Sequence, residues 1–361
     1  MFELENKSNC EAALKRVEAW FHGEVLDRAP VRFSKHNAQY GQARKLDTDR
    51  WPTLEARWFD EEYRIDSFLE SLAGNPLRAE TFPVFWPDLG PDVYAAFFGG
   101  ELTYGENTSW SHPLITDLDD PSQVASVSFD ANNRYLRKVE TITQLALEKC
   151  RGRALIGLTS WTPGIDAVAS WLGPENLCMA LYTHPEAVKE LVDRTLTHFH
   201  PLADRFYDRL AANNLPSVGW MGIPCVGKGH IAQTDFANMI SPEHFAAFCQ
   251  PTLKKEFEGM DKIIFHMDGK GVAVHVEALL AEPGIDAIQW VQGVGDDEPI
   301  LQWIPLIKKI QQAGKALVID LKVEELEPFI SRVGPQGIHL FVSAEENIQE
   351  AIIKRLLHWR A

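Results

Sequence analysis

An alternation of short apolar runs with helical segments extends through most of the chain and is the feature that most restricts its fold. The apolar, β-rich runs lie at 154–159, 217–222, 262–268, 287–291, 316–320 and 338–342. Segments with helical periodicity follow them at 185–213, 242–259, 274–281, 301–313, 323–333 and 345–359. Such an order predicts βα units built around a parallel sheet.

Two earlier apolar runs, 30–34 and 81–86, bring the expected strands to eight, which predicts an α/β fold of the (β/α)8 TIM-barrel type. The runs are almost continuously apolar, as strands are when helices cover one face and packed side chains the other. A doubly wound open sheet is the alternative, but no strand ends in a GxGxxG turn. We expect one domain over 1–361, with an N-terminal helical extension at 1–27 and a long loop at 86–121 after the second strand.

Composition limits the partners of this chain. Its 361 residues carry a formal net charge of −16, and no basic stretch offsets the acidic excess. This argues against nucleic acid and anionic membranes, and no apolar run is long enough to span a bilayer. The five cysteines are scattered without CxxC spacing, so we expect no disulfide framework. A reducing, cytoplasmic location is therefore expected. The expected ligand is a small molecule.

The apolar run at 263–269 ends in His266, Met267, Asp268 and Gly269. Residues i and i+2 of a strand point the same way, so His266 and Asp268 are expected to project together at the end where barrel enzymes carry their catalytic groups. They are candidate catalytic residues. They are also candidate ligands of a divalent metal such as zinc, with Cys225 or His275 as a third ligand. Alternatively, Asp268 orients His266, or the pair contacts the substrate directly.

Other predicted strand ends are polar as well. Asp88 follows the second strand in an aromatic and proline-rich setting, where burial would raise its pKa and suit it to proton transfer; a turn-capping role is the alternative. Asp235 precedes a helix that begins at Ser241 and either reaches the pocket or forms a surface turn. The full set of expected substrate contacts is His36, Tyr40, Trp161, Asp235, His275, Gln289 and Trp290.

Several of these segments together resemble the uroporphyrinogen decarboxylase superfamily, which includes the corrinoid (cobalamin) methyltransferases. The segments are 28–33, 85–88, 157–162, 240–245 with Gln250 and Pro251, and 266–269. The resemblance extends over nearly the whole chain. It implies a (β/α)8 barrel and either decarboxylation or methyl transfer.

The departures from that family narrow the expected activity. The loop at 34–40 has no arginine, so the carboxylates of a porphyrinogen would be left unpaired. The family's methyltransferases bind zinc through His-x-Cys and a later Cys, whereas this chain has Asp268 and Ser343 at the matching places. The resemblance therefore implies corrinoid-linked methyl transfer with a harder metal site and with a corrinoid protein as partner. The sequence leaves the oligomeric state open between a monomer and a homodimer. A decarboxylase of a smaller carboxylate and a non-catalytic ligand-binding barrel are the alternatives.

Overall fold

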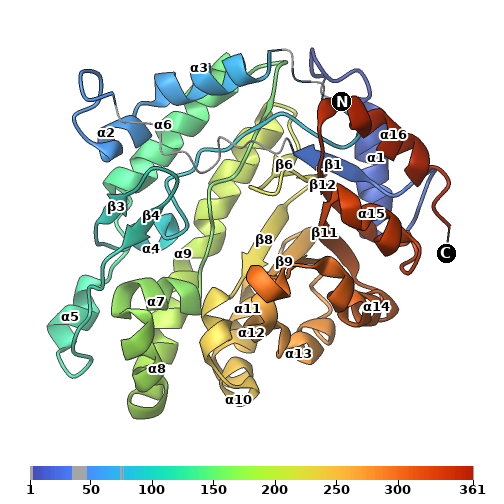
Figure 1. Ribbon diagram of the computed structural model, residues 1–361. Coiled ribbons are helices and arrows are strands. Elements are labelled where there is room, and N and C mark those ends of the chain that lie inside the picture. The colour runs from blue at the N-terminus through green and yellow to red at the C-terminus, as the bar shows by residue number, and fades with distance from the viewer. Residues whose placement is uncertain (1–2, 35–46, 74, 76, 361) are drawn as a thin grey trace.

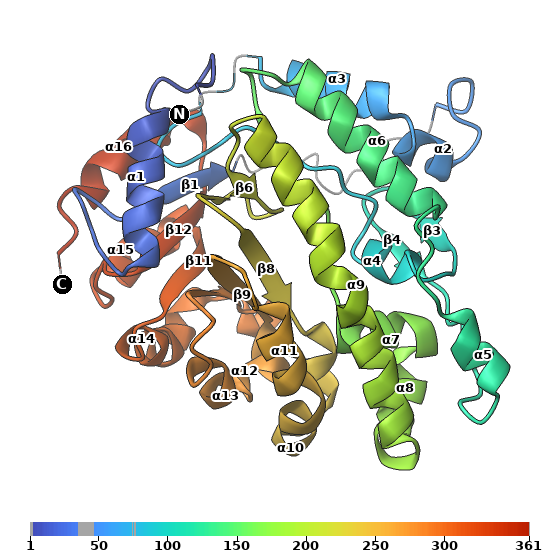
Figure 2. The same cartoon turned by 180° about the vertical axis from the view of Figure 1, so that it is seen from behind.

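A six-stranded parallel sheet forms the centre of the computed structural model, which describes residues 3–34, 47–73, 75 and 77–360 (Figures 1 and 2). In spatial order its strands are β1 (Val31–Ser34), β12 (Ile338–Ser343), β11 (Ala316–Lys322), β10 (Ala287–Val291), β9 (Lys262–Asp268) and β8 (Gly229–Gln233). Helices α11 (Gln250–Glu256), α14 (Ile304–Gln312), α15 (Val323–Ile330) and α16 (Glu346–Leu356) alternate with these strands. The predicted α/β class with a parallel sheet is confirmed.

The remaining strands are short and form separate pairs. Strand β2 (Val84–Phe85) lies parallel to β5 (Leu155–Ile156), while β6 (Ser217–Val218) and β7 (Pro224–Cys225) form an antiparallel hairpin. One backbone hydrogen bond, from Glu80 N to Val31 O (3.0 Å), joins the segment before β2 to β1. Another, from Leu158 N to Val218 O (2.8 Å), joins the segment after β5 to β6. Across the described residues, continuous ladders join six strands, so closure into an eight-stranded barrel stays a prediction.

The fourth strand differs from the prediction. The run at 217–222 contributes only the two residues of β6, and the strand that pairs with β9 is β8, twelve residues further along. Sequence reasoning passed over β8 because it carries His230 and Gln233 among its apolar residues. In the structure His230 is buried and its Nε2 lies 2.7 Å from Glu256 Oε1, so the polar residue fits a buried strand.

The buried residues form two clusters on opposite faces of the strands. The outer cluster joins strand residues such as Phe265 and Ile288 to the surrounding helices. The inner cluster joins their neighbours, such as Ile264 and Ala287, to the N-terminal helix α1 (Cys10–Phe21). Trp20 of α1 is fully buried there and donates a hydrogen bond from Nε1 to Gly337 O (2.9 Å). Helix α1 therefore covers the end of the sheet where β11 and β12 begin, and the predicted N-terminal helix is confirmed.

The other elements surround this sheet and shape its far end. They are α2 (Leu54–Trp58), α3 (Glu61–Ser71), α4 (Val93–Ala96), β3 (Leu102–Tyr104), β4 (Ser109–Ser111), α5 (Pro121–Ser126), α6 (Arg134–Lys149), α7 (Ile165–Leu172), α8 (Pro174–Thr183), α9 (Pro185–Ala212), η1 (Asp235–Met239), α10 (Pro242–His244), a short π-helix (Phe245–Cys249), α12 (Gly269–Ala273), α13 (Val276–Leu280), η3 (Gly295–Asp297) and η4 (Ile300–Trp303). Figure 2 shows α3 and α6 on one side of the molecule and α14, α15 and α16 on the other. Among the described helices, none combines the length and apolarity that a membrane span requires.

Candidate functional site

Three potential metal ligands meet at the carboxyl ends of β8 and β9. One ligand atom from each of Asp235, His266 and Asp268 lies within 4.8 Å of the others. His266 and Asp268 project from the same face of β9, as predicted, and the distance from His266 Nε2 to Asp268 Oδ2 is 4.0 Å. Gln233 at the end of β8 pairs in register with His266, which brings the following Asp235 to the same place. Two carboxylates and one imidazole are a set that binds divalent cations.

The imidazole of His266 is oriented by its neighbours. Its Nδ1 lies 2.7 Å from Oε1 of Gln289 on the adjacent strand β10. With the amide in this orientation its oxygen accepts from Nδ1–H, which leaves the lone pair of the neutral imidazole on Nε2. The indole of Trp220 packs edge-on against the imidazole, with ring centroids 5.1 Å apart. His266 is therefore held in the tautomer that a metal ion requires at Nε2.

Asp166 holds the backbone of the Asp235 turn. Its two carboxylate oxygens accept hydrogen bonds from the backbone N–H groups of Asp235 (2.9 Å) and Phe236 (3.0 Å). Asp166 belongs to α7 and lies 69 residues from Asp235 along the chain. This long-range pair of bonds sets the position from which the Asp235 side chain reaches the cluster.

Asn238 connects the Asp235 turn to the Asp268 turn. Its Nδ2 donates to the backbone carbonyls of Asp235 (3.2 Å) and Asp268 (3.1 Å). A Cβ on Gly271 would lie 2.2 Å from Asn238 Oδ1 and 3.0 Å from Asn238 Cα, so only glycine fits there. Gly271 thus allows the close contact between the two turns.

The carboxylates at this end of the sheet repel one another. Burial, the charge of Asp235 and that of Glu256 raise the pKa of Asp166 to about 7, against the hydrogen bonds from the Asp235 and Phe236 backbone. Desolvation within the crowded cluster, followed by the charge of Asp268, raises the pKa of Asp235. A bound cation would relieve this repulsion, because it favours the ionised carboxylates.

We expect the contribution of Asp166 to the stability of the metal-free protein to fall as the pH rises from about 4 to about 7. The unfolded chain releases the Asp166 proton near pH 4, whereas the folded chain keeps it until about 7. Between these values the folded state binds more protons, so the free energy of unfolding decreases with rising pH. Urea unfolding in chelator at pH 5 and pH 8 measures this decrease. It should be smaller in Asp166→Asn, and equal decreases in the two proteins would contradict the assignment.

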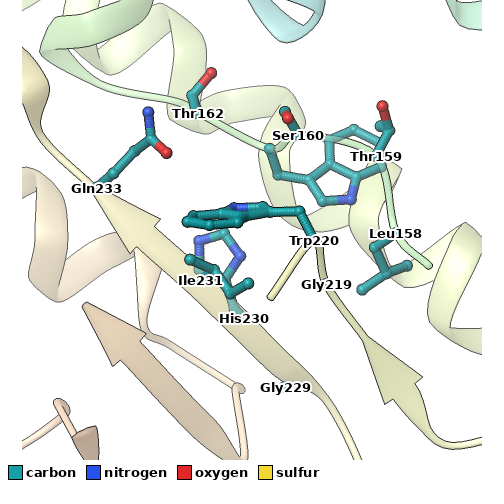
Figure 3. A pocket seen from close by; sticks show the side chains of 11 residues that line it. Leu158, Thr159, Ser160, Thr162, Gly219, Trp220, Gly229, His230, Ile231 and Gln233 are labelled. Atoms are coloured by element: carbon teal, nitrogen blue, oxygen red, sulfur yellow. The ribbon is translucent and has the colours of Figure 1, made fainter. Parts of the chain in front are cut away.

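One hollow adjoins the cluster at Asp235, and a second lies behind Trp220 and Gln233. The larger, of about 370 Å³, is lined by Asp235, Asp166 and Asp92 together with Gln233, Phe236 and Met239, and it is large enough for a small-molecule substrate. The smaller, of about 20 Å³, lies between the end of β5, Trp220 and β8, and its size suits a single water molecule. Figure 3 shows the Trp220 indole across the middle of this smaller pocket, with the side chains of Thr162 and Gln233 above it in the view.

Cys225 does not join the predicted metal set. It lies in β7, packed against Gly229 at the beginning of β8, and Gly229 pairs with Lys262. His266 is four residues further along β9, a separation of roughly 13 Å. Burial raises the pKa of the Cys225 thiol to about 12, which disfavours the thiolate that binds a metal. The prediction failed because the run at 217–222 ends in a hairpin that returns the chain to the other end of the sheet.

Three predicted substrate contacts are buried core residues instead. Trp290 faces the helices and packs against Trp303, because it follows the inward-facing Gln289 and neighbouring strand residues point to opposite faces. His275 stacks on Phe245, and its Nε2 lies 3.0 Å from Ala237 O. Trp161 borders the smaller pocket but is 4% exposed and packs among the aromatic rings of Tyr94, Phe97 and Phe206.

The other predicted residues have distinct positions. Asp88 accepts a hydrogen bond from Gly90 N (2.7 Å), which is the predicted turn-capping role. Burial also raises its pKa, partly offset by that hydrogen bond and by the charge of Arg64. Gln289 orients His266, and Asp235 reaches the cluster. His36 and Tyr40 lie outside the described residues.

Four residues of the site were not among the predicted candidates. They are Asp166, Trp220, Gln233 and Asp320. Gln233 Nε2 donates to Asp235 Oδ2 (3.1 Å), and Asp320 Oδ2 accepts from Gln289 Nε2 (3.5 Å). Trp220 and Asp320 stand at the ends of predicted strands, so their positions were a usable signal. Asp166 lies within a helix and carries no such signal.

Comparisons with known proteins identify a shared fold. No family model and no curated protein matches the sequence. Among solved structures, a methyltransferase from Methanosarcina mazei is similar, with a TM-score of 0.58 over 92% of this chain and 92% of that chain. The two sequences are 12% identical, so the likeness concerns the fold alone.

Proposed function

We propose that this chain is an enzyme that transfers a methyl group to or from a small molecule, assisted by a divalent cation at Asp235, His266 and Asp268. The observation that carries the proposal is the meeting of these three side chains, with the His266 tautomer suited to a metal, beside a hollow of about 370 Å³. The fold shared with a methyltransferase supports it.

The proposal includes a closed (β/α)8 barrel as the framework. One inner cluster unites residues of β5, β6, β9, β10 and β11 with α1, as expected for side chains that fill a barrel. The carboxyl ends of the strands would then form the mouth, where enzymes of this architecture carry their sites. The cluster of Asp235, His266 and Asp268 lies at those ends.

The donor set favours a metal that activates oxygen or nitrogen groups. Carboxylates are harder ligands than thiolates, so the set suits Zn²⁺ or Mn²⁺ with a hydroxyl or amine acceptor better than a thiol-activating zinc site. When bound, such a cation would lower the pKa of a coordinated acceptor and make it nucleophilic. Asp235, His266 and Asp268 would hold the cation, and Trp220 and Gln233 would border the acceptor.

A corrinoid on a partner protein is the proposed methyl carrier. Met239, which lines the larger hollow, exposes 52% of its surface, so an apolar group is available at the rim for a planar cofactor. When bound, such a carrier would supply the methyl group and keep the electron pair of the broken carbon–cobalt bond, while the acceptor would lose its proton.

Metal analysis and a methylcobalamin assay test this proposal. Protein loaded with Zn²⁺ or Mn²⁺ is mixed with methylcobalamin and a panel of small alcohols, phenols and amines. We expect at least one acceptor to produce the Co(I) spectrum, and we expect Asp268→Asn to lose this activity. Failure of the metal-loaded protein with every acceptor would count against methyl transfer, and ligand binding without turnover would favour a non-catalytic barrel.

Decarboxylation of a small carboxylate is the second candidate. It is favoured by the burial of Asp88, which raises the pKa of this carboxyl group in the direction that suits a donor of a proton to the carbanion left by loss of carbon dioxide. Release of carbon dioxide from a panel of aromatic and aliphatic acids, abolished by Asp88→Asn, would support this candidate over methyl transfer.

A further inference from the structure

We propose that Asp320, acting through Gln289, selects the tautomer of His266. Asp320 belongs to β11, Gln289 to β10 and His266 to β9, so the three side chains come from three adjacent strands. The Gln289 amide lies between the other two: its Oε1 is 2.7 Å from His266 Nδ1, and its Nε2 is 3.5 Å from Asp320 Oδ2. Asp320 is a positioning residue in this arrangement, because it acts on His266 only through the amide.

The tautomer is selected because the Gln289 amide has a donor end and an acceptor end. A glutamine amide can turn over with little change of shape, which would present an N–H group to His266 Nδ1 and transfer the imidazole hydrogen to Nε2. An ionised Asp320 opposes this turn because its oxygens only accept hydrogen bonds. The amide nitrogen therefore faces Asp320 and the amide oxygen faces His266.

The surroundings of Asp320 keep the arrangement in place. Gln289 is 5% exposed, so bulk water has little access to either end of its amide. Burial raises the pKa of Asp320, while the hydrogen bond from Gln289 and the positive charge of Arg32 act in the opposite direction. Arg32 of β1 donates to Met221 O (2.7 Å), in the segment that also carries Trp220. The Arg32 guanidinium, two strands away on β1, thus partly offsets the effect of burial on the carboxylate that orients the amide.

Long-range ¹H–¹⁵N correlation spectra of histidine-labelled protein test the inference without any metal. The His266 signal is assigned from its absence in His266→Gln. In the wild-type protein we expect hydrogen on Nδ1 alone. Asp320→Asn should populate the form with hydrogen on Nε2, because the new amide can donate to a turned Gln289.

The exchanged variant, Gln289→Glu with Asp320→Asn, is the matched control. It keeps the net charge. The carboxylate at position 289 accepts from His266 Nδ1, and the amide at position 320 donates to that carboxylate, so we expect the Nδ1 form to be restored. We also expect Asp320→Asn to weaken Zn²⁺ binding by roughly 10- to 100-fold, as loss of outer-shell support does, and the exchanged variant to recover most of that loss. Thermal unfolding checks that each variant folds. If Asp320→Asn does not fold, Gln289→Glu alone provides a second test.

The expected effect on Zn²⁺ binding rests on the proposed function, but the expected tautomer does not. The possible outcomes therefore test the two separately. An Nε2 hydrogen in the wild-type protein, or an unchanged tautomer in Asp320→Asn, would overturn the inference. An Nδ1 hydrogen that shifts as expected, in a protein that binds no Zn²⁺ or Mn²⁺, would support the inference and count against the metal-dependent function.

Discussion

His266→Ala is expected to lower the affinity for Zn²⁺ or Mn²⁺ by roughly a hundredfold or more. Four-ligand protein sites bind zinc with about 10–16 kcal/mol, so one ligand contributes on the order of 3 kcal/mol. His266 supplies the single nitrogen of the cluster and is 13% exposed at its side chain, so water replaces it poorly. Isothermal titration of metal-free protein measures the change. Methyl transfer should fall with metal occupancy.

A surface histidine provides the matched control for this experiment. His22 is 54% exposed and pairs with Glu18 on α1, far along the chain from the cluster. His22→Ala should bind the metal as the wild-type protein does. Equal affinity of His266→Ala and the wild-type protein would show that the three side chains do not hold the cation, and the proposed function would lose its main support.

Glu80→Ala is expected to cost about 3–5 kcal/mol of folding free energy, because it leaves a buried arginine without its counter-ion. The Glu80 carboxylate is fully buried and accepts from Arg28 Nη1 (2.7 Å) and Nη2 (3.0 Å), Arg16 Nη1 (3.2 Å) and Val31 N (2.8 Å). These bonds connect α1 and β1 to the segment that enters β2. For a chain of this length the loss corresponds to a fall in Tm of roughly 5 °C.

Two variants make the Glu80 result specific. Glu11→Ala removes an exposed ion pair with Lys15 on the same helix and should leave the Tm unchanged. Replacing both buried partners, Glu80→Leu with Arg28→Met, should recover part of the loss, because the buried Arg28 guanidinium is removed together with its counter-ion and Arg16 keeps its ion pair with Asp27. If Glu80→Ala is as stable as the wild-type protein, the buried pair does not hold β1 to the β2 segment.

The pair formed by His266 and Asp268 was predictable because it depends on a local rule. Strand side chains alternate, so an apolar run that ends His-x-Asp places both groups on one face. The same rule shows why Trp290 was assigned wrongly, since it follows Gln289 directly and must face the other way. Local periodicity was therefore sufficient to predict which side chains of β9 face the site. Applied strictly, it would have predicted the same for β10.

The third member of the cluster depended on the strand that sequence reasoning missed. Asp235 was among the candidates, but only the register of β8 beside β9 brings it to His266. The polar His230 concealed β8, because its compensation by Glu256 comes from a helix and is visible only after folding. Cys225 was assigned wrongly for the related reason that its hairpin reverses the chain.

The sequence by itself determined the α/β class, the N-terminal helix and the His-x-Asp pair, because each follows from periodicity over neighbouring residues. Tertiary structure decided which residues complete the site. Asp166 reaches the Asp235 turn across 69 residues, and Asp320 reaches His266 through an amide on the strand between them. Such contacts depend on strand order and register, which arise from packing of the whole chain and are not encoded in any single segment.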